Sequence, residues 1–359
     1  MKISKIPGLG RFGVFIDDLD FATITDEEWM EIGKLHMESL VTIIRNVKID
    51  LKEYNRRIAQ FGSPRTLAVI NVCKKYGIST FSQLNRLSVA KKINGVEVSK
   101  EDREWFRMVM NVTALEEMGE ITPVLRVSGK KDEKGNPLGM FAEGELLWHS
   151  NESGNLLFSP AVSLLGNSGM VGSSTGFVTT TDWYEDQSES FRSELDEMVL
   201  VHKFTPGRIN PGLRAEQDEV MHRNMCPVDG TEIPLVIQSP IGIKGLHYSV
   251  NTIDSIKGMS KKDSDKVFER INKGLFTEKY IYDHWYKQDN DLLLFDNSIT
   301  LHRRLGGITN RMAYRIQYDY CHISPPNWQP YFSEPYQSQY NQDYKEGLEL
   351  LTQLGIGVY

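Results

Sequence analysis

Apolar and polar positions follow a helical period in three places within the first hundred residues. The longest is WMEIGKLHMESLVTIIR, and the segment TDEE that starts at Thr25 gives it the form of a capping box. Its apolar positions are Ile32, Leu35, Met37, Leu40 and Ile43. Two shorter helix candidates begin at Asp50 (LKEYNRRIAQFG) and after Ser79 (TFSQLNRL). The pattern predicts a mixed, largely helical N-terminal part, residues 1–104.

From about residue 105 the pattern changes to short apolar or alternating runs separated by turns. These runs are ITPVLRVSG, NLLFSPAVSLLG, TGFVTTTDW, IPLVIQSPIG, LHYSVNTI, DLLLFDNSITLH and MAYRIQYDY, and each predicts β-structure. Two segments with a helical period interrupt them, SESFRSELDEMVLVHKF and SKKDSDKVFERINKGLF. Many short strands with attached helices predict a mixed α+β fold with a β-sandwich or jelly-roll core over residues 105–323.

The last segment, residues 324–359, is rich in proline, glutamine and tyrosine, as in PPNWQPYFSEPYQSQYNQDY. We expect an irregular arm that packs on the surface or against a second subunit. No internal repeat or low-complexity linker divides the chain. We therefore expect residues 1–359 to form a single domain with the three parts just described.

Composition narrows the class of protein. The net charge of -7 and the pI of about 5.7 argue against a nucleic-acid or anionic-membrane partner. The three cysteines, Cys73, Cys226 and Cys321, are far apart, which fits a reducing compartment and excludes a zinc finger. The sequence has neither an uninterrupted apolar signal region nor an apolar run of the roughly 20 residues that span a membrane. A cytoplasmic protein is the expectation.

Most of the eight histidines are best explained as surface or core residues, but two have informative neighbours. His149 and His302 each end an apolar run, and Arg315 follows 13 residues after the second. Neighbouring strands can bring distant histidines together at the mouth of a jelly roll. A non-haem iron site that uses 2-oxoglutarate needs two imidazoles and a carboxylate on one face, and an arginine fork for the far carboxylate of 2-oxoglutarate. The order of these three residues fits that requirement.

With these motifs the chain resembles the taurine/2,4-D dioxygenase family of Fe(II)/2-oxoglutarate-dependent oxygenases. LLWHSN resembles the family pattern W-H-[ST]-D, DNSITLHRR resembles D-N-R-x-x-x-H, and RMAYR resembles R-x-x-x-R. The segment GSSTGFV, with TDWYED after it, resembles the family's G-G-x-T segment. The region from GVFIDDLDF to the FG before Ser63 is also similar, so the resemblance covers most of the chain.

The resemblance implies a double-stranded β-helix (jelly roll) with flanking helices, and Fe(II) and 2-oxoglutarate as cofactors. The implied reaction oxidises a small molecule, in most members by hydroxylation, and decarboxylates 2-oxoglutarate to succinate. His149 and His302 would bind the metal. Thr175 and Arg315 would bind the distal carboxylate of 2-oxoglutarate, with Arg311 in support. A homo-oligomer is also implied.

Two neighbouring polar residues match positions that surround such a metal site. They are Asp296 and Asn297, which precede the second metal histidine. We expect them to hold the strand turn rather than to touch substrate.

One residue departs from the family pattern, because Asn151 stands where the third metal ligand should be an aspartate or glutamate. In a first interpretation iron is held by His149, His302 and either a weak Asn151 amide or water. In a second, Glu152 supplies the carboxylate, which requires a bulge or tight turn because adjacent side chains of an extended chain point to opposite faces. In a third, the chemistry is impaired or changed, and the chain is a ligand-binding member of the same fold. Halogenation is disfavoured, because asparagine is too large to leave room for a halide.

The residue four positions before the first metal histidine is Glu145. The resemblance allows this side chain to face the substrate, which would suit a cationic substrate or an amino acid derivative; the alternative is a solvated strand residue or a partner for a lysine. Trp148 should pack into the core. A cupin-type metal enzyme without 2-oxoglutarate is a weaker alternative, because Arg311 and Arg315 would have no dicarboxylate to bind.

Overall fold

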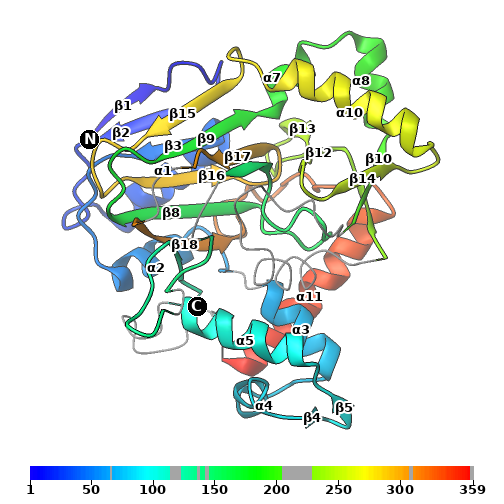
Figure 1. Cartoon of the computed structure of the whole chain (residues 1–359). Coiled ribbons are helices and arrows are strands. Elements are labelled where there is room, and N and C mark those ends of the chain that lie inside the picture. The colour runs from blue at the N-terminus through cyan, green and yellow to red at the C-terminus, as the bar shows by residue number, and fades with distance from the viewer. Residues whose placement is uncertain are drawn as a thin grey trace.

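Two β-sheets form the centre of the molecule (Figure 1). The computed structural model describes residues 1–64, 67–113, 123–135, 138–141, 145–203, 229–306 and 310–355. The larger sheet has the order β1-β2-β3-β16-β8-β18-β6 and the smaller sheet the order β15-β9-β17-β7. Neighbouring strands are antiparallel except β2 and β3, which are parallel.

The strands of the larger sheet are β1 Lys2–Lys5, β2 Val14–Asp17, β3 Val41–Ile44, β16 Leu292–Asp296, β8 Ala161–Ser168, β18 Met312–Tyr318 and β6 Leu125–Ser128. Those of the smaller sheet are β15 Ile281–Trp285, β9 Ser174–Thr179, β17 Thr300–Arg304 and β7 Leu146–His149. Apolar side chains of both sheets share one buried cluster, and the rings of Phe177 and Phe295 lie 5.2 Å apart across it. The predicted mixed fold with a β-rich core is confirmed.

A second group of elements lies at one end of the smaller sheet, where Figure 1 shows α7, α8 and α10 beside β10 and β14. The helices are α7 Thr180–Glu185, α8 Glu189–Asp196 and α10 Lys261–Leu275. The strands are β10 Val199–His202, β11 Thr231–Pro234, β12 Val236–Gln238, β13 Lys244–Leu246 and β14 Ile253–Ile256. The predicted helix SESFRSELDEMVLVHKF is correct only in its first half, because VLVH pairs with β11 and β14 as a strand.

The predicted N-terminal helices are present as α1 Asp26–Ser39, α2 Leu51–Ala59 and α4 Phe81–Arg86. Thr25 and Glu28 form the predicted capping box, and the Asp50 side chain caps α2. The first helix is shorter than predicted. Its last apolar residues, VTII, form β3 instead, because β-branched side chains buried on both faces suit a strand between β2 and β16.

The boundary placed near residue 105 is wrong. Helix α5, Lys100–Val112, runs across it, and a further helix, α3 Leu67–Tyr76, was not predicted. A short hairpin, β4 Lys92–Ile93 and β5 Val96–Glu97, lies between α4 and α5. Trp105 and Phe106 of α5 are buried in the core cluster that this helical part of the chain forms.

The C-terminal segment contradicts the predicted irregular arm. Residues Tyr336–Leu354 form α11, which packs on α3 (Figure 1). Its buried residues Tyr340, Gly347, Leu351 and Leu354 recur every three to seven positions along one face. The polar residues between them dominate the composition, and they hid the helical period.

Cys73 and Cys321 are free thiols, and Cys226 lies outside the described residues. Within the described part of the chain, no helix combines the length and apolar character needed to cross a membrane.

Candidate active site

The two predicted metal histidines lie opposite each other on adjacent strands of the smaller sheet. His302 of β17 is the antiparallel partner of His149 of β7, so both side chains project from the same face. Their ring centroids are 4.1 Å apart, and the His302 ring lies 4.8 Å from Phe295 of the opposite sheet. The imidazole pair is therefore directed between the two sheets, although 153 residues of sequence separate its members.

The surroundings of the pair favour a neutral imidazole at His302 and orient the ring of His149. The Nδ1 of His149 donates a hydrogen bond to the Leu147 carbonyl oxygen at 2.7 Å, so Nε2 is the nitrogen that can bind a metal. Burial holds the pKa of His302 well below its usual range, and the nearby His149 and Arg315 lower it further. The buried Nδ1 of His302 has no hydrogen-bond partner among the described residues. A neutral imidazole is the form that coordinates metal ions.

Asn151 is held in place through its backbone. The Asn297 side chain accepts a hydrogen bond from the Asn151 amide nitrogen at 2.7 Å and donates one to its carbonyl oxygen at 2.9 Å. Asn297 also donates to the Ser159 carbonyl oxygen, and Asp296 accepts bonds from the Ser298 and Ile299 amides. Both residues hold the strand turn, as predicted. The buried side-chain nitrogen of Asn151 makes no hydrogen bond within the described chain.

Glu152 adopts the turn that its role as a metal ligand would require, with a left-handed φ of 61°. Its carboxylate turns toward Ser159, where Oε2 accepts hydrogen bonds from the hydroxyl at 2.6 Å and from the amide at 3.1 Å. Burial raises the pKa of Glu152, and hydrogen bonds from Ser159 and Gln317 and the charge of Arg315 oppose that rise. No group of three His, Cys, Asp or Glu side chains with metal-binding geometry occurs among the described residues.

Thr175 belongs to a buried polar cluster on the same face of the smaller sheet as the imidazole pair, because it lies two residues from Phe177, the cross-strand partner of His302. Its hydroxyl lies 3.2 Å from that of Tyr286, just beyond β15. Burial raises the pKa of Tyr286, and the positive charge of Arg311 opposes that rise. Arg311 is itself 5% exposed. The structure thus places Thr175, Tyr286 and Arg311 in one neighbourhood, with a buried cation available for an anionic group.

Arg315 lies in a different neighbourhood. Burial lowers its pKa to about 10, while the negative charge of Glu152 opposes that change. Its guanidinium lies 5.6 Å from the centre of the Phe141 ring, and its Nε is buried without a hydrogen-bond partner in the described structure. Arg315 is thus electrostatically linked to Glu152 and His302, whereas Arg311 is linked to the cluster around Thr175.

Two residues next to the first metal histidine have simpler roles. Glu145 precedes β7 and has an exposed side chain, so the structure does not gather it with the imidazole pair. Trp148 packs in the core as predicted, stacked on Phe276 with a ring separation of 5.5 Å. The exposure of Glu145 favours the alternative of a solvated residue.

Sequence reasoning missed the partners that complete the site. Tyr286, Ser159 and Gln317 contact the predicted residues but carry no motif of their own. Strand register brings Tyr286 near Thr175, because β15 pairs with β9. A regular alternation of aromatic residues at Tyr282, His284 and Tyr286 was the available signal.

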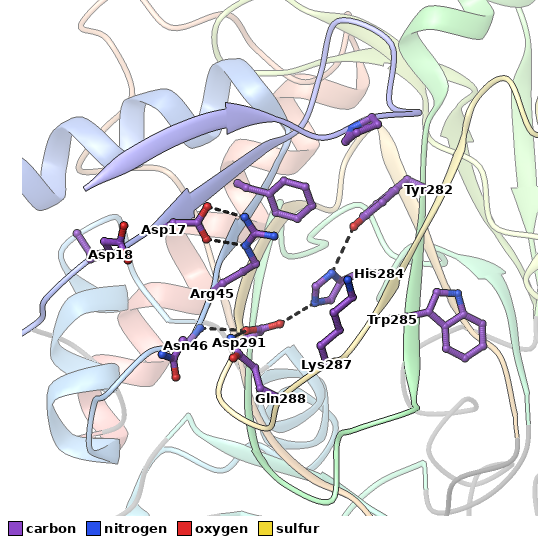
Figure 2. Close-up of a pocket in the computed structure, with 13 residues that line it drawn as sticks. Asp17, Asp18, Arg45, Asn46, Tyr282, His284, Trp285, Lys287, Gln288 and Asp291 are labelled. Carbon is purple, nitrogen blue, oxygen red and sulfur yellow. Dashed lines mark hydrogen bonds and ion pairs between the residues drawn. The ribbon is translucent and has the colours of Figure 1, made fainter.

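A cavity of about 640 Å³ opens at the free edge of β15, as Figure 2 shows. Its described lining does not include the imidazole pair. Within it, His284 Nε2 donates to Asp291 Oδ2 at 2.9 Å, and Arg45 forms a two-point ion pair with Asp17. Asp291 also accepts a bond from the Asn46 amide, so these contacts tie the segment before β16 to the end of β3.

Comparison with known families gives one match that spans the candidate site residues. The family model described as "Taurine catabolism dioxygenase TauD, TfdA family" matches residues 3–317. A search of curated proteins gives no significant match.

Solved structures share the fold at low sequence identity. One is the crystal structure of AAD-2 in complex with Mn(II) and N-oxalylglycine, 16% identical, with a TM-score of 0.58 over 89% of this chain and 97% of that one. Another is a taurine dioxygenase from Burkholderia xenovorans, 18% identical, with a TM-score of 0.56 over 88% of this chain and 89% of that one. At such identities the likeness concerns the fold, whereas the family match rests on sequence. The chain belongs to the TauD/TfdA family of Fe(II)- and 2-oxoglutarate-dependent dioxygenases.

Proposed function

We propose that this dioxygenase hydroxylates a small molecule at a metal held by His149, His302 and the side-chain oxygen of Asn151. The observation that carries the proposal is the cross-strand pairing of the two histidines, with rings 4.1 Å apart. Both imidazoles are on one face, as a facial iron site requires. The smaller sheet, which carries both histidines, and the larger sheet facing it would be the two halves of a jelly roll, which agrees with the fold of the similar structures.

The residues present fit an iron ion in part. Two imidazoles are available, and the buried side-chain nitrogen of Asn151 has no hydrogen-bond partner among the described residues, so no protein contact there fixes the orientation of the amide. An amide oxygen is a weaker ligand for a divalent cation than a carboxylate, because it carries no charge. We propose that Asn151 rather than Glu152 is the third ligand, since Ser159 already binds the Glu152 carboxylate. Bound iron with 2-oxoglutarate would supply the oxidation and the decarboxylation to succinate.

Arg311 and Arg315 would bind opposite ends of 2-oxoglutarate. We propose that Arg311 and Thr175 bind its distal carboxylate, because Tyr286 links the surroundings of these two residues. Arg315, near Glu152 and His302, would face the end of 2-oxoglutarate that approaches the metal. This assignment exchanges the roles that the family resemblance suggested for the two arginines. Burial would strengthen both ion pairs, because the local dielectric constant is low.

The substrate remains a small molecule of unspecified identity, and the suggested cationic character at Glu145 stays a prediction. The homo-oligomer and the cytoplasmic location also stay predictions. A second function, ligand binding without turnover, is favoured by one observation, the absence of a carboxylate at position 151.

Anaerobic spectroscopy separates the two functions. Fe(II) added with 2-oxoglutarate should give a visible metal-to-ligand charge-transfer band in the wild-type protein, and His302→Ala should abolish it. Arg303→Gln is the matched control, because Arg303 lies next in the strand but pairs with Asp283. Absence of the band at saturating Fe(II) and 2-oxoglutarate would refute the oxygenase and leave the binding protein.

A further inference from the structure

A second pair of buried histidines lies beside the candidate metal site. His202 ends β10 and His247 follows β13; both are 0% exposed. Their ring centroids are 6.1 Å apart. Neither residue belongs to a motif of the resemblance, and neither was predicted to have a role.

Hydrogen bonds attach both rings to the segment that carries Asn151. The Nδ1 of His202 lies 2.9 Å from the Thr252 hydroxyl, which lies 3.0 Å from the Ser153 hydroxyl. The Nδ1 of His247 donates to the Ser298 carbonyl oxygen at 3.0 Å, and the residue before Ser298 holds the backbone of Asn151. His202 is therefore attached through Thr252 to Ser153, two residues after Asn151, and His247 is attached to Ser298, next to the residue that holds the Asn151 backbone.

The opposite edge of each ring is unsatisfied. The Nε2 atoms of His202 and His247 are buried, and neither makes a hydrogen bond of normal geometry with a described protein group. Buried polar atoms nearly always have a partner, so two such atoms in one place call for an explanation. Since the Nδ1 of His247 carries the proton, its Nε2 presents a lone pair. Burial lowers the pKa of His247 to about 4, although the backbone groups of Ser298 and Ser153 oppose that change, and the ring is therefore neutral at physiological pH.

The chemistry of the second pair defines what it can recognise. The unprotonated Nε2 of His247 accepts a hydrogen bond from an ammonium or hydroxyl group but offers nothing to a sulfonate or carboxylate oxygen, so the preference for a donor rests on this residue. His202 can act as donor or acceptor, because the Thr252 hydroxyl can take either role. The Phe158 ring, 4.7 Å from His247, adds an apolar wall.

We propose that His202 and His247 form a substrate subsite that receives an N–H or O–H donor of the substrate. This inference rests on the proposed function, since it places the substrate beside the metal segment. It assigns a substrate class: a small molecule with an amine or hydroxyl group near the oxidised carbon, rather than an acid such as a sulfonate.

Nitrogen NMR of the full chain labelled with ¹⁵N-histidine tests the subsite with three matched probes, n-propylammonium, n-propanol and propane-1-sulfonate. Propylammonium or propanol should shift the His247 Nε2 resonance in a saturable manner, and the one that does so distinguishes a charged from an uncharged donor. The sulfonate should leave it unchanged. His36 of α1, buried and with no partner for its Nδ1 among the described residues, is the internal control. A saturable shift with the sulfonate, or with none of the probes, overturns the subsite.

Two variants separate recognition from folding. His247→Phe keeps a ring against Phe158 but removes the acceptor, and should weaken binding of the active probe at least tenfold. His247→Gln, whose side-chain oxygen can accept a hydrogen bond, should restore part of that loss. His322→Gln, at an exposed histidine, should bind like the wild type. Equal probe binding by His247→Phe and the wild type would contradict the proposal, and a normal His36 resonance certifies the fold of each variant.

The charge-transfer experiment keeps the two proposals apart. If the Fe(II)/2-oxoglutarate band appears but no probe shifts His247, the oxygenase stands and the subsite fails. If a donor probe shifts His247 but the band is absent, the subsite stands as a binding site and the oxygenase fails.

Discussion

Asn151 has an amide where the family pattern expects the carboxylate of a metal ligand. The surrounding structure keeps the position intact, because the Asn297 side chain holds the Asn151 backbone through two hydrogen bonds. The nearest carboxylate in sequence, Glu152, is bound by Ser159. The departure at position 151 therefore changes the charge of one candidate ligand and leaves the shape of the site intact.

Asn151→Asp should strengthen Fe(II) binding by about tenfold or more, which corresponds to about 1.4 kcal/mol. The substitution is nearly isosteric and adds the missing negative charge. Calorimetric titration with Fe(II) under anaerobic conditions measures it, with Asn151→Ala as the matched control that should weaken binding. If the aspartate variant binds iron no better and forms less succinate, the amide itself is required by the native site.

Arg311→Gln should weaken 2-oxoglutarate binding by about 1.5–3 kcal/mol, the range for hydrogen bonds to charged groups. The reason is its buried position in the neighbourhood of Thr175 and Tyr286. Titration of the charge-transfer band with 2-oxoglutarate gives the affinity. Thr175→Val should produce a smaller loss, and Arg303→Gln none. An unchanged affinity in Arg311→Gln would return the distal carboxylate to Arg315.

At the scale of elements, strands and helices position the site in different ways. Pairing of β17 with β7 sets the two metal histidines side by side, and pairing of β15 with β9 brings Tyr286 to Thr175. The helix α11 supports the region from outside. Its Tyr340 packs in an aromatic group with Tyr331, Phe332 and Phe158, which leads to Ser159 and the Glu152 turn.

Tyr340→Ala should destabilise the protein by about 3–5 kcal/mol, the usual cost of deleting a large buried aromatic side chain. The side chain is 4% exposed and lies in the core between α11 and the segment around Phe158. Chemical denaturation measures the loss. Gln339→Ala, one position away on the same helix and exposed, should change the stability by less than about 0.5 kcal/mol. Equal stability of the two variants would mean that α11 is only loosely attached.

At the scale of the whole molecule, burial of neutral histidines links stability to pH. Burial lowers the pKa of His36 to about 3 and that of His247 to about 4 from the ordinary 6.5. At a pH between the lowered pKa of the folded state and 6.5, each of these histidines is protonated in the unfolded chain but neutral in the folded chain. The contribution to stability is therefore complete above pH 6.5 and is lost as the pH falls toward 4.

The free energy of unfolding in urea should fall between pH 7.5 and pH 5 by about 1.4 kcal/mol per pH unit for each such histidine, once below pH 6.5. Metal-free protein is used, so that iron ligation does not contribute. The exposed-site variant His322→Gln should keep the same slope. A free energy that stays constant or rises over this interval would contradict neutral burial of these residues.

The sequence predicted the strand-rich core, the capped helices and the order of the candidate site residues, because these depend on local signals. A continuous apolar run marks β16, alternating side chains in YRIQY mark β18, and the Thr25 capping box marks α1. Local signals failed where context decides. VTII and VLVH became strands because buried neighbours pair with them, and α11 became a helix because its sparse apolar face packs on α3.

The sequence by itself determined the family and singled out the two candidate metal histidines, the two arginines and the amide at position 151. Only the tertiary structure decided what each of them touches, because contacts across a sheet depend on strand register, which no short motif contains. Register brought His149 to His302 and Tyr286 to Thr175, and the turn after β7 directed Glu152 to Ser159. Burial then left His202 and His247 unsatisfied beside the metal segment, a property that no stretch of the sequence displays.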